Sequence, residues 1–280
     1  MALIGVDLGG TNVRAGLVED DRVVKMAARP VRSQGKAEEV LADLTAVLEE
    51  ILNPQVQGIG IGVPSVVDLE TGTIYDVQNI PAWKELPLKK ILEDRYLLPV
   101  YVNNDANCFA VGEKYFGLGK PYDNLVGLIV GTGLGAGLIT SGHLYAGSNC
   151  GAGEFGMLPY LEANFERYAS GQFFLKSYGR SGKEFYELAC AGDQSARKVF
   201  QEFGRHLGEA LKAIMYAVDP EAIILGGSVS RAFEFFQGSM FEAISIFAYS
   251  IALRRIKIKV STTENIAILG AAALYLDSLR

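Results

Sequence analysis

The sequence is poor in cysteine and histidine, the residues that stabilise small secreted domains through disulfides and metal sites. It contains three cysteines, Cys108, Cys150 and Cys190, and two histidines among 280 residues. The cysteines are too widely spaced for a disulfide framework or for a pair of metal ligands. We therefore expect reduced thiols, which are typical of a cytoplasmic protein.

Long apolar runs and an excess of positive charge are also missing. The most apolar stretch, residues 125–140, is interrupted by five glycines, so we expect no membrane span. A strand-like run begins at Leu3, so we expect no signal peptide. The formal net charge is −6, which disfavours binding to nucleic acid and to acidic membrane surfaces.

What is present is ample material for a folded core. At about 150 residues per domain, the length predicts two domains. Hydrophobic residues make up 49% of the sequence and charged residues 21%, proportions that exclude intrinsic disorder. The 32 glycines, against 9 prolines, indicate tight turns and close backbone approaches rather than a flexible linker.

Hydrophobic periodicity predicts alternating strands and helices. In the first half we expect strands at 3–8, 12–18, 22–29, 56–63 and 98–102, with helices at 36–52 and 106–116. In the second half we expect strands at 125–130, 135–140, 143–146, 222–225 and 256–260. A long helix there carries an apolar stripe from Ala196 to Ile214, and a last helix covers 266–279.

The two halves share an internal repeat. An offset of 121 residues brings Thr11 onto Thr132 and the tripeptide at 15–17 onto the same three residue types at 136–138, without a gap. Such a duplication of a strand–turn–strand unit predicts two similar lobes, whose glycine turns face a common cleft.

The first glycine turn is Asp7-Leu8-Gly9-Gly10-Thr11-Asn12. Adjacent glycines let backbone N–H groups point into a concave turn that suits phosphate oxygens, and Thr11 and Asn12 add side-chain donors. Asp7 is an acid suited to hold a hydrated Mg²⁺. An ordinary hairpin turn explains the same residues equally well.

The second turn, Gly131-Thr132-Gly133-Leu134-Gly135-Ala136, matches the dinucleotide fingerprint G-x-G-x-x-A as a string. That fingerprint must open a helix, whereas here a short apolar strand continues to Thr140. We therefore interpret this turn as the second half of a phosphate clamp. The sequence contains no G-x-x-x-x-G-K-[ST] motif, which excludes a P-loop nucleoside triphosphatase.

Polar residues follow further strands and turns. Asn104 and Asp105 come after the strand at 98–102, where Asp105 could accept a proton from an attacking hydroxyl, or the pair could cap a helix. Gly226-Gly227-Ser228 follows a buried strand and forms either a surface for a nucleobase or an N-capped turn. Glu154 and Glu166 lie in glycine-flanked turns, and a carboxylate can take two vicinal hydroxyls of a sugar.

Together and in this order, these motifs resemble the ROK family of sugar kinases and sugar-sensing repressors, in the actin-like ATPase superfamily. The resemblance runs from Gly5 to the last helix and also rests on Asn79 to Trp83 and on Asn104-Asp105-Ala106-Asn107. It implies a duplicated, two-lobed α/β fold of the ribonuclease H-like type with a cleft between the lobes. We expect a small lobe at 1–115 plus 264–280 and a large lobe at 116–263.

The resemblance also implies a role for each motif. Asp105 would be the general base. The residues that bind ATP would be Asp7, Gly9, Gly10, Thr11, Asn12, Gly131, Thr132, Gly133, Gly226 and Gly227. The residues that bind the sugar would be Ser65, Asn79, Asn104, Asp105, Glu154 and Glu166.

The sequence departs from the family pattern at the sugar end. Many members have glycine where Ser65 stands, and most have a zinc-binding histidine where this chain has Met157. Residues 158–165 contain neither cysteine nor histidine, so we expect no structural zinc. Mg²⁺ would enter with ATP, near Asp7.

The sequence therefore predicts a cytoplasmic hexose kinase that uses ATP and Mg²⁺ and forms the hexose 6-phosphate, with glucose as the first candidate. Kinases of N-acetylglucosamine, N-acetylmannosamine, mannose or fructose are alternatives, and so is a non-catalytic sugar sensor. A repressor would need an N-terminal helix-turn-helix, for which the residues before Asp7 leave no space. The resemblance implies a homodimer, and the aromatic-rich stretch from Phe233 to Phe247 belongs either to its surface or to the core.

Overall fold

The computed structural model describes residues 1–279, which group into two compact units. The first unit comprises residues 1–123, 137–152 and 262–279, and the second comprises residues 124–136 and 153–261. The expected lobes placed residues 137–152 in the large lobe, whereas by contact they group with the first unit. Gly142 N donates to Asp123 O (2.8 Å) and Leu144 N donates to Asp277 Oδ2 (3.3 Å).

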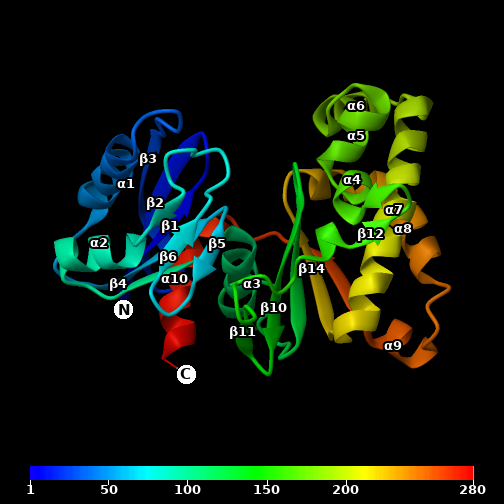
Figure 1. Ribbon diagram of the computed structural model, residues 1–280. Coiled ribbons are helices and arrows are strands. Elements are labelled where there is room, and N and C mark those ends of the chain that lie inside the picture. The colour runs from blue at the N-terminus through cyan, green and yellow to red at the C-terminus, as the bar shows by residue number, and fades with distance from the viewer. Residues whose placement is uncertain (280) are drawn as a thin grey trace. The chain divides into compact units, whose positions relative to one another are not determined.

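Five strands form the sheet of the first unit, in the order β3-β2-β1-β4-β8 (Figure 1). The strands are β1 (Ala2–Leu8), β2 (Asn12–Glu19), β3 (Arg22–Pro30), β4 (Val56–Val63) and β8 (Val100–Asn104). β1, β2 and β3 pair antiparallel, whereas β4 lies parallel to both β1 and β8. The strands predicted for this half are confirmed, and β8 begins two residues later than expected.

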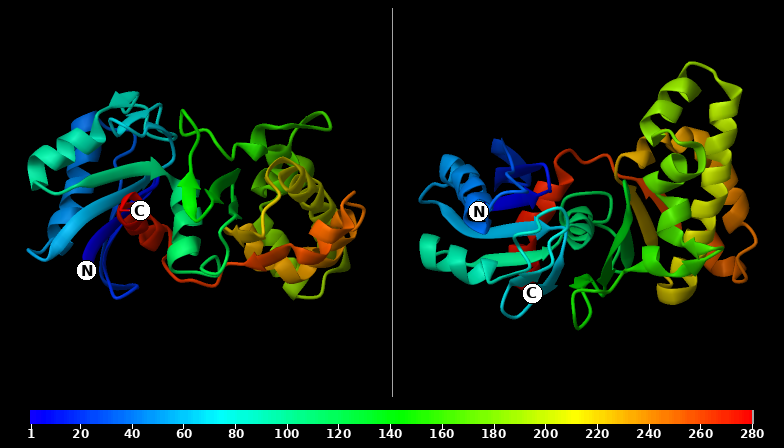
Figure 2. Two further views of the ribbon diagram at one scale, coloured as in Figure 1. Left: turned by 90° about the horizontal axis from the view of Figure 1, so that it is seen from below. Right: turned by 45° about the horizontal axis from the view of Figure 1, so that its top comes forward.

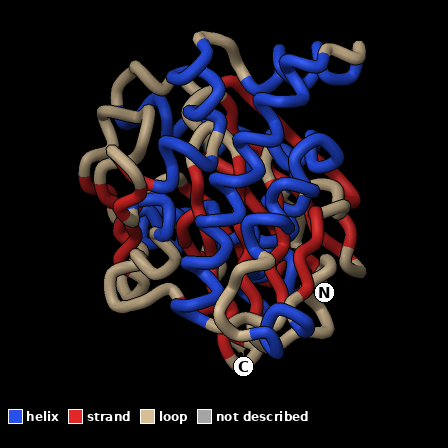
Figure 3. The backbone as a smooth tube through the Cα atoms, turned by 90° about the vertical axis from the view of Figure 1, so that its right-hand side faces the viewer, coloured by secondary structure: helices blue, strands red, loops and turns tan. Residues whose placement is uncertain are grey.

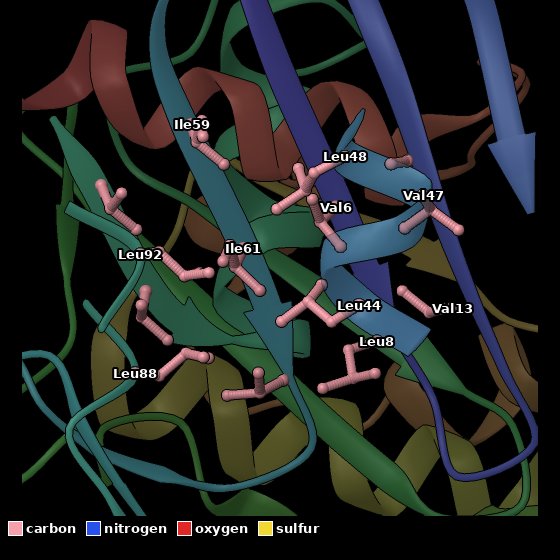
Figure 4. Close-up of a cluster of buried hydrophobic side chains, with 14 of the residues drawn as sticks. Val6, Leu8, Val13, Leu44, Val47, Leu48, Ile59, Ile61, Leu88 and Leu92 are labelled. Atoms are coloured by element: carbon pink, nitrogen blue, oxygen red, sulfur yellow. The ribbon is translucent and has the colours of Figure 1, made fainter. Parts of the chain in front are cut away.

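Helices cover both faces of this sheet. On one face, α1 (Ala37–Ile51) and α2 (Leu88–Tyr96) bury a layer of aliphatic side chains against β1 and β4 (Figure 4). On the other face, α10 (Ile266–Ser278) packs against β1 and β4 and against α3 (Asp105–Tyr115). Because both of their faces are covered, the central strands β1 and β4 are buried at nearly every position, as parallel strands of α/β proteins are, whereas the edge strand β3 is mostly exposed.

A small antiparallel sheet was not expected from the sequence. It contains β5 (Val66–Asp68), β6 (Thr73–Tyr75) and β7 (Glu85–Leu86), in that order, between β4 and α2. Strands of two or three residues are too short to give a periodic signal. The insertion matters for the site because it carries Ser65 at its start and Asn79 after β6.

The second large sheet repeats the strand order of the first. Its order is β11-β10-β9-β14-β15, with β9 (Leu125–Val130), β10 (Leu134–Thr140), β11 (His143–Tyr145), β14 (Ala222–Gly226) and β15 (Lys257–Val260). β10 and β11 pair antiparallel, and β14 lies parallel to both β9 and β15. The same order around two similar glycine turns confirms the repeat that the sequence predicted.

The second unit is rich in helices (Figures 1 and 2). Its α-helices are α4 (Phe165–Ala169), α5 (Gly171–Tyr178), α6 (Gly182–Cys190), α7 (Gln194–Val218), α8 (Phe233–Ile244) and α9 (Ser250–Arg255). Its smaller elements are the 3₁₀ turns η1 (Phe155–Met157) and η2 (Val229–Ala232) and the hairpin of β12 (Pro159–Tyr160) and β13 (Ala163–Asn164). The tube in Figure 3 shows how loops connect these helices and strands.

The long helix α7 buries the apolar stripe that the sequence predicted, and α8 packs along it. Phe236 and Met240 on α8 and Phe247 after it are buried within the second unit, whereas Phe241 is 45% exposed. The aromatic-rich stretch therefore belongs mainly to the core. Within residues 1–279, no helix combines the length and the apolar character needed to cross a bilayer.

Candidate active site

The first glycine turn joins β1 to β2 in the first unit. Gly9 N donates to Asn12 O (2.9 Å), which closes the turn. A Cβ atom on Gly10 would lie 2.5 Å from Cβ of Asn79, closer than two such carbons can approach. The absence of a side chain at Gly10 is therefore what lets Asn79 lie against the turn. The structure thus brings together an expected phosphate-binding residue and an expected sugar-binding residue.

Asp7 lies at the start of this turn, and its carboxylate forms an ion pair with Arg14, its partner across β1 and β2. The Asp7 side chain is 23% exposed. A Mg²⁺ ion bound directly to Asp7 would compete with the Arg14 guanidinium for the same carboxylate. The donor set therefore fits a Mg²⁺ that arrives bound to phosphate oxygens better than one held by the protein alone.

The end of β8 and the start of α3 place two more expected site residues. Asn104 is the N-cap of α3: its Oδ1 accepts from Ala106 N (2.9 Å), and its Nδ2 donates to the Ser65 carbonyl (3.3 Å). Asp105 is the first residue of α3 and is half-buried. The N-cap residue and the proposed base are therefore neighbours in sequence, and an acidic side chain in the first turn lies at the positive end of the helix dipole.

Behind Asp105 lies a buried cluster of two amides and a thiol. Asn103 Oδ1 accepts from Asn107 Nδ2 (2.9 Å) and from Cys150 Sγ (3.3 Å). All three residues are at most 6% exposed. The cluster fixes the first turn of α3 to the loop that contains Cys150. Burial, with the charge of Asp105 next, raises the pKa of the neighbouring Cys108 well above its usual value, so this thiol stays protonated.

Ser65 and Asn79 differ in what their side chains do. Ser65 Oγ lies 2.8 Å from both the Val66 and the Tyr75 carbonyl oxygens, so its single proton is directed at the backbone of the β5–β6 hairpin. Asn79 is exposed and has a positive φ of 66°. Of the two, Asn79 presents its amide to solvent, where a hydroxylated ligand can reach it.

The second glycine turn lies in the second unit, between β9 and β10, and is followed by a strand rather than a helix. Gly171 N, at the start of α5, donates to Gly131 O (2.7 Å), and Ser170 Oγ lies 3.0 Å from Thr132 O. A Cβ atom on Gly133 would lie 2.5 Å from Glu166 Oε2, so a side chain at this position would displace that carboxylate from its bond with Leu134 N.

Glu166 is both an expected sugar-binding residue and a support for this turn. Its Oε2 accepts from Leu134 N (3.1 Å), and its Oε1 accepts from Gln172 Nε2 (2.7 Å). Glu154 belongs to the same unit. Desolvation, with the negative charge of Glu166 next, raises the pKa of Glu154 above its usual value. Each carboxylate retains lone pairs for a hydroxyl donor, since an ionised carboxylate has about four acceptor positions.

A cavity of about 490 Å³ opens beside the second turn, entirely within the second unit. Gly131, Thr132 and Gly171 form one end. Its remaining walls combine apolar and polar side chains: Leu175, Ser181, Lys183, Tyr186, Glu187, Phe200, Ser228, Val229 and Arg231. A volume of this size with a few polar groups is typical of a small-molecule site.

Gly226 and Gly227 stand at the edge of this cavity rather than in its wall. Gly226 ends β14, and Gly227 turns the chain with a φ of 86°. Ser228 and Val229, which directly follow, line the cavity, and Ser228 makes no side-chain capping bond to η2. The turn therefore directs the next two residues into the cavity wall.

A model of the ROK family matches residues 3–278. The chain belongs to the ROK family. A glucokinase of Thermotoga maritima is 30% identical, with 100% of this chain and 98% of that protein covered. A xylose repressor of Bacillus subtilis is 30% identical, over 79% of this chain and 61% of the repressor. The crystal structure of a ROK glucokinase from Streptomyces griseus, in complex with glucose and AMPPNP, is 28% identical, with a TM-score of 0.81 and 98% and 99% of the two chains covered.

The comparisons confirm two predictions for this ROK protein: the family itself and the α/β fold of ROK sugar kinase structures, which is the actin-like ATPase fold. The roles of individual residues stay predictions. Met157, which stands where the family pattern has a histidine, is 50% exposed, and its Sδ lies 3.9 Å from Asn164 Nδ2. Among residues 1–279, no three histidine, cysteine or acidic side chains gather in a way that could hold a metal ion.

Several residues of the site were missed in the sequence. Ser170 is one of them: only its contacts with Thr132 and Glu166 show its function in the turn. The amide–thiol cluster and the α6 side of the cavity gave no local signal. Their members come from separate segments of the chain, which only packing brings together.

Proposed function

We propose that this ROK protein is a hexose kinase that transfers the γ-phosphoryl group of ATP to the 6-hydroxyl of a sugar, with glucose as the first candidate. N-acetylglucosamine, N-acetylmannosamine, mannose and fructose are the alternative acceptors. The observation that carries the proposal is Asp105, a half-buried carboxylate in the first turn of a helix directly after a parallel strand. Ligands of open α/β sheets gather at the carboxyl ends of strands.

Asp105 would accept the proton of the attacking hydroxyl as the hydroxyl approaches phosphorus. Asn104 and Asn79, which belong to the first unit, would orient the sugar. Glu154 and Glu166, which belong to the second, would accept hydrogen bonds from its hydroxyl groups. Because both amide ends of Asn104 already bind the backbone, Asn104 is rigidly placed. A rigid neighbour favours strict selection of the reacting hydroxyl.

The donor would bind in the cavity of the second unit. Tyr186 and Phe200 offer apolar surface for a purine, and the cavity reaches Gly131 and Thr132 of the glycine turn. The backbone of that turn, with the turn at Gly9 and Gly10, would receive phosphate oxygens. Mg²⁺ bound to ATP would neutralise charge on the transferring group. The relative crystallised with AMPPNP supports ATP as the donor.

The side chain of Met157 favours relaxed selection among sugars that differ at carbons 1 and 2. Met157 has a thioether where the family pattern has a histidine, and a thioether is only a weak acceptor. Glucose, mannose and N-acetylglucosamine should therefore be used with efficiencies within about 10²-fold of one another.

The test is a coupled ADP-release assay across these sugars, with Asp105→Asn as the diagnostic variant. Loss of the base should lower kcat by at least about 10²-fold while changing sugar affinity much less. The matched control is Asp94→Asn, an exposed aspartate that pairs with Lys90 on α2. Sugar binding without ADP release by the wild type would instead indicate a sensor, and near wild-type turnover by Asp105→Asn would refute the assignment of the base.

A further inference from the structure

The segment between Met157 and Glu166 is held by aromatic contacts. It forms the hairpin β12–β13, whose register pairs Pro159 with Asn164 and Tyr160 with Ala163. The Tyr160 ring stacks on Phe165, with centroids 4.5 Å apart and planes 17° apart. Strands of two residues do not hold a conformation by themselves. The position of this hairpin must therefore come from what it packs against.

The partner of the hairpin is His206, which projects from the middle of α7. Tyr160 Oη lies 3.1 Å from His206 Nδ1. The imidazole also packs against Tyr168 and Phe173, with ring centroids 5.2 Å and 5.4 Å away. Desolvation lowers the pKa of His206 below its usual value. The neutral ring is therefore favoured near pH 7, and in the tautomer that carries its proton on Nε2, Nδ1 accepts a hydrogen bond from Tyr160 Oη.

These contacts enclose α4, the five-residue helix that carries Glu166. Phe165 directly precedes Glu166 and Tyr168 lies two residues after it, and both rings contact Tyr160. A helix of five residues is unstable alone, because the conformational entropy lost in forming its first turn exceeds the stabilisation from the few hydrogen bonds gained. Packing of its aromatic residues against Tyr160 and α7 must fix its position.

The consequence reaches the glycine turn. Glu166 holds Leu134 N and Gln172 Nε2 with its two carboxylate oxygens. A shift of α4 would stretch both bonds, since neither partner belongs to α4. The contact series therefore runs from His206 through Tyr160 and α4 to Glu166, and from there to the turn at 131–133.

We propose that Tyr160 and His206 are positioning residues, which hold Glu166 in place for sugar binding and for support of the 131–133 turn. The role at the turn stands on the contacts above, whereas the role in sugar binding rests on the proposed function. Tyr160 lies in the segment in which we expect the family's zinc loop to be missing, and its contact with His206 on α7, inside an aromatic cluster, holds this segment in place.

Three variants test the pair. Tyr160→Phe removes the hydroxyl and keeps the ring, His206→Phe removes the acceptor and keeps an apolar side chain, and His206→Asn keeps an acceptor near the position of Nδ1. The control is Tyr216→Phe, the same chemical change on α7, where the hydroxyl accepts from Ala248 N (3.1 Å). None of these residues belongs to the proposed binding or catalytic set.

The first readout needs no substrate: amide hydrogen exchange of peptides covering 131–136 and 158–168. Tyr160→Phe and His206→Phe should speed exchange in both peptides by about 3- to 10-fold, the range for one lost hydrogen bond. Tyr216→Phe should leave both peptides unchanged, and His206→Asn should restore slow exchange. Unchanged exchange in Tyr160→Phe and His206→Phe, or equal acceleration in Tyr216→Phe, would overturn the positioning role.

The second readout is sugar phosphorylation. The same two variants should raise KM for the sugar by about 3- to 10-fold with kcat reduced less, because the lost contact positions a binding group and not the base. Rescue of KM by His206→Asn is required. Normal KM in a variant with accelerated exchange would restrict the role to the turn. Absence of any phosphorylation by the wild type would refute the proposed function, while the exchange result would still decide the positioning of α4.

Discussion

Replacement of Gly10 by alanine tests whether the first turn and Asn79 form one unit. The new Cβ atom would lie 2.5 Å from Asn79 Cβ, 3.2 Å from Cγ and 3.3 Å from Nδ2. Non-bonded carbons prefer about 3.5–4.0 Å, so the turn or Asn79 must move by about 1 Å. Overpacking of this kind costs about 1–3 kcal/mol.

That cost should appear in binding as well as in stability. We expect Gly10→Ala to raise KM for both ATP and the sugar by about 5- to 150-fold, the equivalent of 1–3 kcal/mol. Gly151→Ala is the control, because a Cβ there meets nothing within 4 Å and Gly151 lies outside the proposed binding set. It should change either KM by less than about 3-fold, since it makes no close contact.

A double variant separates the clash from other effects. Asn79→Gly removes the Cβ atom with which the new side chain of Gly10→Ala would clash. Glycine also readily adopts the positive φ of 66° found at position 79. Asn79→Gly alone should weaken sugar binding and leave KM for ATP nearly normal. Adding Gly10→Ala to it should then cost little for ATP, a non-additivity expected only of residues in contact. Equal effects of Gly151→Ala and Gly10→Ala, or full additivity in the double variant, would refute the steric reasoning.

Two further outcomes follow from the second unit. The purified protein should contain no stoichiometric zinc, and a strong zinc chelator with excess Mg²⁺ should leave activity intact; one zinc per chain by elemental analysis would contradict this. The pKa of Glu154 is raised in the folded state by desolvation and by Glu166, so the penalty for its charge is absent below the unfolded pKa and grows as pH rises. Glu154→Gln should therefore raise the melting temperature at about pH 8 and not at about pH 4. The exposed control Glu162→Gln should leave the melting temperature unchanged at both pH values. An equal rise for Glu154→Gln at both pH values would exclude an ionic cause.

The sequence alone determined the main strands and the two glycine turns. Alternation and apolar runs located the strands, and the 121-residue offset identified the repeated strand–turn–strand unit, whereas the strand order that the two large sheets share came from the structure. These features are readable because a strand or an amphipathic helix has its own period, and a glycine turn has its own composition. The family pattern followed from the same motifs in the same order.

Only the tertiary structure decided how those motifs are supported. Tyr160 meets His206 from 46 residues away, and Cys150 meets Asn103 from 47 residues away. The tight fit of Gly10 against Asn79 depends on an insertion whose strands are too short to predict. Such contacts have no local signature, because each partner satisfies its own helix, strand or loop equally well without the other. Their positions depend on how separate elements pack, and packing depends on side-chain volumes across the whole core.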